Sequence, residues 1–267
     1  MKEFFLKNRG LYYRTNEFLS DRQTIVFVHG LSGSSSAWLP YEKDLESSFN
    51  ILSFDLRGHG KSEKPLSYEE YKMKYFAEDL HELTEYLKID KFILVGHSLG
   101  CFVVLDFLRA HQEKVSKVIF LAPNFSVGNM LSAKLIIPLL WLGIALWKKF
   151  PFSGRAGGHI DYTRFPNTGD WNIPRMIADI GNTTMRVYLY ATRQTYDFDA
   201  EDFLDKIYVP ALIIHGEKDT IFPVKYGILM AGKIPSAKLV LLEDADHILA
   251  LNKVKEILRE IRSFVVN

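Results

Sequence analysis

A serine flanked by glycines stands between two apolar segments of the chain. The pattern Gly-x-Ser-x-Gly spans residues 96–100, directly after the run Phe92–Val95 and directly before residues 101–108. Such a serine sits on a sharp strand-to-helix turn with its hydroxyl outward, and the glycines leave room for that turn. The alternative is a tight turn in which Ser98 only caps a helix. The apolar flanks on both sides favour Ser98 as a nucleophile.

A serine hydroxyl is a weak nucleophile at neutral pH, so it needs a base to accept its proton and an acid to orient that base. Asp219 and His247 each follow a later apolar run of the chain. The carboxyl ends of parallel strands form the ligand crevice of an open sheet, so we expect both residues to meet Ser98 there. Asp244 and Asp246 are competing candidates for the acid.

The elements that must position these residues alternate along the chain. Eight short apolar runs predict strands, the first two as a hairpin: Phe4–Leu6, Leu11–Tyr13, Thr24–Val28, Ile51–Phe54, Phe92–Val95, Val118–Leu121, Ala211–Ile214 and Leu239–Leu242. Helical patterns lie between them, at residues 37–48, 69–88, 99–111, 223–232 and 248–265. This alternation predicts an α/β fold with a mostly parallel sheet. It stops between Asn124 and Lys206, where we expect an insertion with a loop over residues 154–174.

Five motifs together resemble the α/β-hydrolase superfamily over nearly the whole chain. They are His29-Gly30, residues 55–62, residues 96–100, residues 216–219 and Asp246-His247. The resemblance implies a core domain of residues 1–123 and 207–267, built on an eight-stranded α/β-hydrolase sheet. It also implies a helical cap, residues 124–206, inserted after the sixth strand. The similar branch contains small carboxylesterases, monoacylglycerol lipases and C–C bond hydrolases.

In a chain with this resemblance, Ser98, His247 and Asp219 are expected to form a catalytic triad in the family's chain order. Ser98 would attack the substrate, His247 would carry the proton, and Asp219 would orient the imidazole. Because the nucleophile is a serine, the epoxide hydrolases and haloalkane dehalogenases of this fold, which use aspartate, are not expected activities.

The oxyanion hole is expected to combine two backbone N–H groups, those of Leu99 and Leu31, with Ser32 as the alternative to Leu31. Each donor of this kind contributes about 3 kcal/mol to stabilising the transition state. The loop that begins at Gly30 therefore matters as much as the triad.

One apolar segment, Leu135–Trp147, contains no charged residue and is followed by Lys148 and Lys149. As a helix it would measure about 20 Å, too short for a hydrocarbon core of about 30 Å. We favour a lid over a binding cavity, in which Leu140 and Trp141 contact the substrate. The alternative is an interfacial helix that makes transient contact with a membrane surface.

The bulk composition excludes several functional classes. A formal net charge of +1 without a block of lysine or arginine gives no support for a nucleic-acid partner. The histidines are scattered and there is one cysteine, Cys101, so we expect no metal site and no cofactor. The first ten residues carry four charges and no apolar run of signal-peptide length, so the cytoplasm is the expected location.

The function that these residues favour is a serine carboxylesterase or acylglycerol lipase. Its partner would be a lipophilic small-molecule ester with a medium or long acyl chain. Other reactions on the same triad are alternatives: C–C bond hydrolysis, lactone opening or a lyase reaction. A ligand receptor that keeps the fold with negligible turnover is a further one, because a fold does not fix a function. The oligomeric state is left open.

Overall fold

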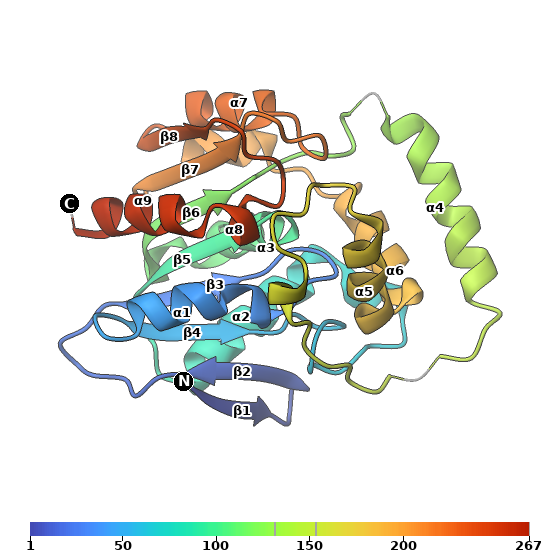
Figure 1. The fold of residues 1–267 in the computed structure, drawn as a ribbon, viewed down its shortest axis with the longest axis horizontal. Coiled ribbons are helices and arrows are strands. Elements are labelled where there is room, and N and C mark those ends of the chain that lie inside the picture. The colour runs from blue at the N-terminus through green and yellow to red at the C-terminus, as the bar shows by residue number, and fades with distance from the viewer. Residues whose placement is uncertain (131, 153, 267) are drawn as a thin grey trace.

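A twisted eight-stranded sheet forms the centre of the molecule in the computed structural model, which describes residues 1–130, 132–152 and 154–266 (Figure 1). Its spatial order is β1-β2-β4-β3-β5-β6-β7-β8. The strands are β1 Lys2–Leu6, β2 Leu11–Thr15, β3 Thr24–Val28, β4 Asn50–Phe54, β5 Phe92–His97, β6 Val115–Leu121, β7 Ala211–Gly216 and β8 Ala237–Leu242. β1 and β2 pair in antiparallel fashion, β2 is antiparallel to β4, and all other pairs are parallel. The predicted fold class is confirmed.

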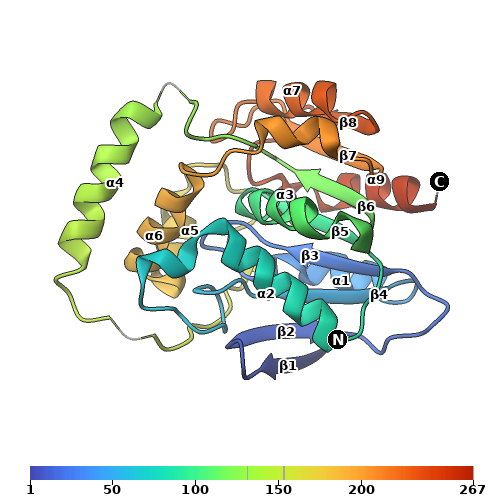
Figure 2. The same ribbon diagram turned by 180° about the vertical axis from the view of Figure 1, so that it is seen from behind.

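Helices cover both faces of this sheet (Figures 1 and 2). The helices are α1 Leu39–Leu45, α2 Met73–Tyr86, α3 Leu99–His111, α4 Ala133–Trp147, α5 Ile173–Thr183, α6 Met185–Thr195, α7 Lys225–Lys233, α8 Leu249–Asn252 and α9 Val254–Val266. Three predicted helices are shorter or broken. A 3-10 turn precedes both α1 and α2, and the helix expected at 248–265 is divided at Lys253 into α8 and α9.

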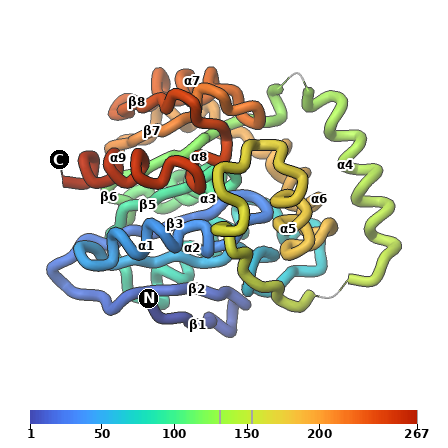
Figure 3. Tube along the Cα trace, viewed as in Figure 1, coloured from blue at the N-terminus to red at the C-terminus, as the bar shows by residue number. Residues whose placement is uncertain are grey.

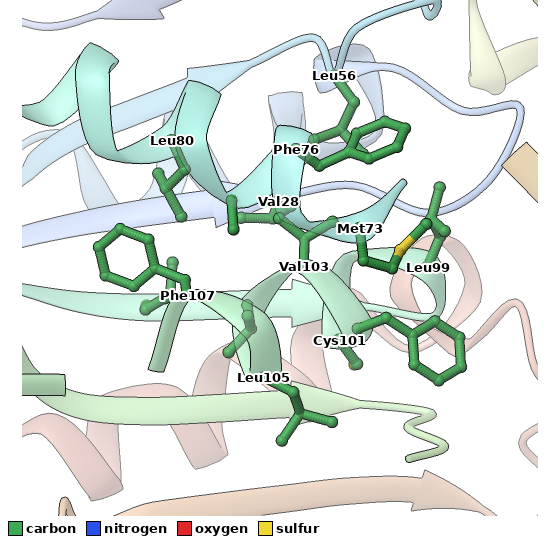
Figure 4. Close-up of a cluster of buried hydrophobic side chains, with 14 of the residues drawn as sticks. Val28, Leu56, Met73, Phe76, Leu80, Leu99, Cys101, Val103, Leu105 and Phe107 are labelled. Carbon is green, nitrogen blue, oxygen red and sulfur yellow. The ribbon is translucent and has the colours of Figure 1, made fainter. Parts of the chain in front are cut away.

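The central strands are apolar on both faces because each face packs on a helical layer. Along β3, Val26 and Val28 belong to the cluster formed with α2 and α3, while Ile25 and Phe27 face the cluster formed with α1 and α9. Figure 4 shows the first cluster, in which Val28 lies between side chains of α2 and α3. These two layers fix the strand ends that carry the functional side chains.

The segment between β6 and β7, here called the β6–β7 insertion, contains α4, α5 and α6 (Figure 3). It lies beyond the carboxyl ends of the parallel strands, and α4 stands at the outer edge of the molecule against α6 (Figure 1). Residues 154–172 are irregular apart from one 3-10 turn at Tyr162–Arg164, and α5 begins at Ile173, inside the predicted loop. Among the described residues, no helix has the length and apolarity needed to cross a membrane.

Candidate active site

Ser98 lies on a strained turn between β5 and α3. Its backbone has φ 52° and ψ −116°, a left-handed region that non-glycine residues rarely adopt. The flanking glycines permit this turn. A Cβ atom on Gly100 would lie 2.4 Å from the carbonyl oxygen of Val28, and one on Gly96 would lie 2.8 Å from the carbonyl oxygen of Gly100. The strain presents the Ser98 hydroxyl at the carboxyl end of the sheet.

The structure brings Ser98, His247 and Asp219 into one hydrogen-bonded chain. The distance from Ser98 Oγ to His247 Nε2 is 2.7 Å, and that from His247 Nδ1 to Asp219 Oδ2 is 2.8 Å. A carboxylate only accepts hydrogen bonds, so Nδ1 carries the imidazole proton and Nε2 is free to accept from the Ser98 hydroxyl. All three side chains are buried. This geometry suits proton transfer from serine to histidine.

Asp219 is held as an anion by several donors. Its Oδ1 atom accepts hydrogen bonds from the backbone N–H groups of Ile221 and Phe222, at 2.9 and 2.7 Å. The Nε2 atom of His215 lies 3.2 Å from Oδ2. Burial alone would raise the pKa of Asp219, but hydrogen bonds from His215 and His247 prevail and keep the pKa well below its usual range. The competitor Asp244 is exposed and pairs with Lys218 instead.

His97, the residue before the serine, supports the histidine loop. Its Nε2–H donates a hydrogen bond to the carbonyl oxygen of His247 at 2.9 Å. Burial lowers the pKa of His97 to about 3, so the ring stays neutral and keeps its proton on the nitrogen that faces His247. The imidazole of His97 therefore positions a backbone and takes no part in the triad.

A carboxylate that sequence reasoning missed joins the site from the β6–β7 insertion. Asp170 Oδ1 accepts from the backbone N–H of His247 at 2.8 Å. Its Oδ2 accepts from the backbone N–H and the hydroxyl of Thr220, at 2.9 and 2.6 Å. Asp170 thus connects the loop that carries Asp219 to the loop that carries His247. In the sequence it is one acidic residue in an irregular segment, and no spacing marks it.

The two predicted oxyanion donors lie beside the nucleophile. Leu31 and Leu99 both border the cavity that contains Ser98. In the part of the chain that the structure describes, no hydrogen bond uses either of their backbone N–H groups. The alternative residue, Ser32, has φ 61°, and its carbonyl oxygen accepts from Thr183 at the end of α5. Helix α5 therefore fixes the loop from which one donor comes.

An apolar cavity of about 450 Å³ opens at Ser98. Its apolar lining includes Leu31, Leu99, Phe102, Val127, Ile136, Leu140 and Phe222. Leu140 thus faces the predicted cavity, whereas Trp141 is not among the residues that line it. The Trp141 indole is 41% exposed and lies against the ring of Tyr68, with the ring centroids 5.3 Å apart. Successive residues on a helix point about 100° apart, so neighbours on α4 face different surroundings.

A second, smaller cavity of about 80 Å³ also borders the serine. Ser98 and Leu31 border both cavities, but His247 borders only the smaller one. Its lining is polar where α5 contributes Arg175 and Asp179, joined by an ion pair at 2.9 Å. The sequence analysis did not single out these two residues, because an i,i+4 pair of opposite charges is the usual pattern of a solvent-exposed helix face.

Comparison with known proteins adds a family match. A family model described as alpha/beta hydrolase fold matches residues 23–254. An uncharacterised protein of Mycobacterium tuberculosis is 24% identical over 257 residues, which cover 88% of this chain and 73% of that protein. The probable lysophospholipase BODYGUARD 2 of Arabidopsis thaliana is 22% identical, with 90% of this chain and 58% of that protein covered.

Solved structures agree at the level of the fold. A hydrolase from Pseudomonas aeruginosa superposes with a TM-score of 0.76 at 20% identity, covering 96% of this chain and 94% of that one. An enol-lactonase from Burkholderia xenovorans LB400 has a TM-score of 0.73 at 24% identity, covering 96% of each chain. At these identities the likeness concerns the fold and does not extend to the substrate.

Proposed function

Because this chain belongs to the alpha/beta hydrolase fold family, we propose that it is a serine hydrolase of carboxylic esters with a medium or long apolar acyl chain. The observation that carries the proposal is the hydrogen-bonded chain from Ser98 Oγ through His247 to Asp219, with contacts of 2.7 and 2.8 Å. The N–H groups of Leu31 and Leu99, which meet no acceptor among the described residues, would complete the machinery as the oxyanion hole.

The reaction would proceed by acyl transfer in two steps. Ser98 Oγ attacks the ester carbonyl carbon while His247 Nε2 accepts the hydroxyl proton. The negative charge that develops on the carbonyl oxygen is stabilised by the N–H groups of Leu31 and Leu99. His247 then returns the proton to the departing alcohol, and water, activated by the same imidazole, hydrolyses the acyl-enzyme. Asp219 keeps the imidazole in the required orientation and stabilises its charged form.

The apolar cavity supports the preference for a lipophilic acyl group. Its volume of about 450 Å³ lies within the usual range of ligand pockets, and aliphatic and aromatic side chains dominate its lining. Helix α4 contributes Ile136 and Leu140, so we propose that the β6–β7 insertion acts as a cap, within the predicted limits 124–206. The name of the relative BODYGUARD 2, a probable lysophospholipase, is consistent with an ester that carries an acyl chain.

Other reactions on the same triad are the main alternative. The enol-lactonase of the same fold illustrates that lactone opening occurs on this architecture. Lactone opening, C–C bond cleavage and ester hydrolysis give different products, so product identification separates them. A receptor with negligible turnover would form an acyl-enzyme once and release no further product.

The outer face of α4 supports a transient contact with a membrane surface. Four leucines at helical spacing are exposed on it: Leu135, Leu139, Leu142 and Leu146. Lys134 and Lys148 flank them, and residues 114–160 contain no acidic side chain. Apolar residues with basic flanks suit a surface that contains anionic lipid. Sedimentation with anionic vesicles, compared with the variant Leu139→Asn, tests this contact.

Covalent labelling by a fluorophosphonate tests the proposed chemistry. Phosphonylation of the serine hydroxyl requires an activated nucleophile and does not depend on which ester is natural. We expect one label per chain, located at Ser98 by mass spectrometry, and no label in Ser98→Ala. Labelling at another serine, or none at all in the folded wild type, would contradict the proposal.

A further inference from the structure

Two cavities meet at the nucleophile, and their positions relative to His247 distinguish their roles. The apolar cavity includes Leu99 but not His247, whereas the small cavity includes His247 and lies along the loop from His29 to Gly33. In ester hydrolysis the histidine must reach the oxygen of the departing alcohol to return the proton. The small cavity is therefore on the alcohol side of the scissile bond, and the apolar cavity is on the acyl side.

Two residues that border the small cavity each carry a buried N–H donor without a partner among the described residues. The indole Nε1 of Trp38 and the guanidinium Nε of Arg175 make no hydrogen bond with any described residue. Trp38 is fully buried and Arg175 is 6% exposed. Buried donors are nearly always satisfied in folded proteins, so two unsatisfied donors at one cavity indicate a ligand with acceptor atoms.

The other two nitrogens of the Arg175 guanidinium make hydrogen bonds within the β6–β7 insertion. Its Nη1 donates to Asp179 Oδ2 at 2.9 Å, and its Nη2 donates to the carbonyl oxygen of Asp170 at 3.1 Å. The hydroxyl of Tyr162 donates to the other oxygen of Asp179 at 3.0 Å. Nε is thus the one guanidinium nitrogen without a hydrogen bond among the described residues, and the bonds of Nη1 and Nη2 hold it in place.

Charge at this cavity decides between an anionic and a neutral ligand. Burial raises the pKa of Asp179 to about 6, so above that pH its carboxylate balances the charge of Arg175. A ligand carboxylate would face the carboxylate of Asp179 as well as the guanidinium, which removes most of the gain from binding an anion. An uncharged oxygen accepts from both free donors without this repulsion.

We propose that this cavity is a subsite for the alcohol part of the ester, selecting a short, uncharged alcohol whose own oxygen accepts hydrogen bonds from Trp38 Nε1 and Arg175 Nε. The proposal rests on the ester hydrolysis proposed above and specifies the substrate further. A volume of about 80 Å³ corresponds to two or three water molecules at about 30 Å³ each, which limits the alcohol to a few heavy atoms.

The test compares two octanoate esters that have the same number of heavy atoms, 2-hydroxyethyl octanoate and propyl octanoate. Both give the same acyl-enzyme, so a difference in kcat/KM reports the alcohol part alone. One added hydrogen bond in a buried site is worth about 0.5–1.5 kcal/mol, or about 2- to 13-fold. We expect the wild type to favour the hydroxyethyl ester by at least about 5-fold.

Two variants remove the free donors. Trp38→Phe removes the indole N–H. Arg175→Lys keeps the positive charge beside Asp179 but loses Nε and the hydrogen bond from Nη2 to the carbonyl oxygen of Asp170, so the preference between the two esters, and not the absolute rate, is the readout. We expect each to reduce the preference to below about 2-fold while propyl octanoate is still hydrolysed. Trp147→Phe, an exposed tryptophan outside both cavities, is the matched control and should keep the wild-type preference. If both donor variants keep the wild-type preference for the hydroxyethyl ester, the subsite proposal is wrong and the cavity holds only solvent.

A binding measurement keeps the subsite testable if neither ester is hydrolysed. The chain has four tryptophans, and the indole N–H resonance of Trp38 is the one absent from Trp38→Phe. Ethylene glycol, the alcohol of the preferred ester, should shift this resonance in the wild type at millimolar concentration and less so in Arg175→Lys. No shift would overturn the subsite. A shift without any ester hydrolysis would instead retain the subsite and reject the proposed reaction.

Discussion

The carboxylate of Asp170 accepts a hydrogen bond from the backbone N–H of His247 at 2.8 Å, so a residue of the β6–β7 insertion holds the loop of the histidine. The same carboxylate binds the N–H and hydroxyl of Thr220, the residue after Asp219. The insertion therefore helps to set the relative position of two triad members, in addition to covering the substrate.

Asp170→Asn should lower kcat because an amide cannot accept at both of its terminal atoms. One of the two loops then loses its partner, and a displacement of about 1 Å in a catalytic group costs up to about 100-fold. We expect a 10- to 100-fold loss of kcat on a short ester with little change in KM. The rate of fluorophosphonate labelling should fall in parallel.

The matched control for this change is Asp244→Asn, in the loop that carries His247. Asp244 is exposed, pairs with Lys218 and does not contact the imidazole. Its kcat should stay within about 2-fold of the wild type. Equal losses in both variants would mean that Asp170 acts only through general stability.

Gly100→Ala should damage the turn that presents Ser98. The added Cβ would lie 2.4 Å from the backbone oxygen of Val28, so β3 or α3 must move. Overpacking of this kind costs about 1–3 kcal/mol of unfolding free energy, and the labelling of Ser98 should be lost with it. The free energy of unfolding is measured by urea unfolding monitored by circular dichroism.

Gly232→Ala provides the control for that substitution. Gly232 lies in α7, and a Cβ built there meets no atom within 4 Å. Alanine in a helix is favoured over glycine by about 0.5–1 kcal/mol, so this variant should be slightly more stable than the wild type and fully active. A stable, active Gly100→Ala would contradict the strained turn.

The sequence predicted those parts of the site that can be recognised from residues adjacent along the chain. The turn at Ser98 is indicated by the glycines and apolar runs within a few residues of it. The ends of the strands before Asp219 and His247 are indicated by the apolar runs that precede these residues. Asp170 could not be found this way, because its partners Thr220 and His247 lie 50 and 77 positions away. The partners of Arg175 are local, but the sequence does not show that its helix face borders the cavity at Ser98. The direction of Trp141 was likewise open, since an apolar helix without a polar face does not reveal which side is covered.

Leu140→Asn should act selectively on long acyl chains. Leu140 is 9% exposed and lines the apolar cavity, so a carboxamide there would contact the chain. We expect kcat/KM for a decanoate ester to fall by about 10-fold or more, while an acetate ester is hydrolysed almost as before. Leu139→Asn, whose side chain is 65% exposed on the same helix, should leave both unchanged. Equal losses on both esters in Leu140→Asn would indicate a damaged fold.

Acid should destabilise the protein partly through His97. Burial lowers its pKa from 6.5 to about 3, so below pH 6.5 the unfolded chain binds a proton that the folded state excludes. Stability from this group is complete above pH 6.5 and is lost as pH falls toward 3, by about 1.4 kcal/mol per pH unit. The variant His97→Gln lacks this group, so its unfolding free energy should fall less steeply between pH 6 and pH 5. Identical slopes, measured by urea unfolding, would contradict the neutral buried ring.

The most direct test of the proposed reaction is the hydrolysis of ethyl esters from acetate to palmitate, whose alcohol is small enough for the small cavity, by the wild type and by Ser98→Ala. The wild type should release the free acid, with kcat/KM rising toward medium and long chains, and the variant should lose at least about 1,000-fold in kcat, as removal of a triad serine typically does. A wild type that is inert on every ester, or a variant as active as the wild type, would contradict serine ester hydrolysis at this site.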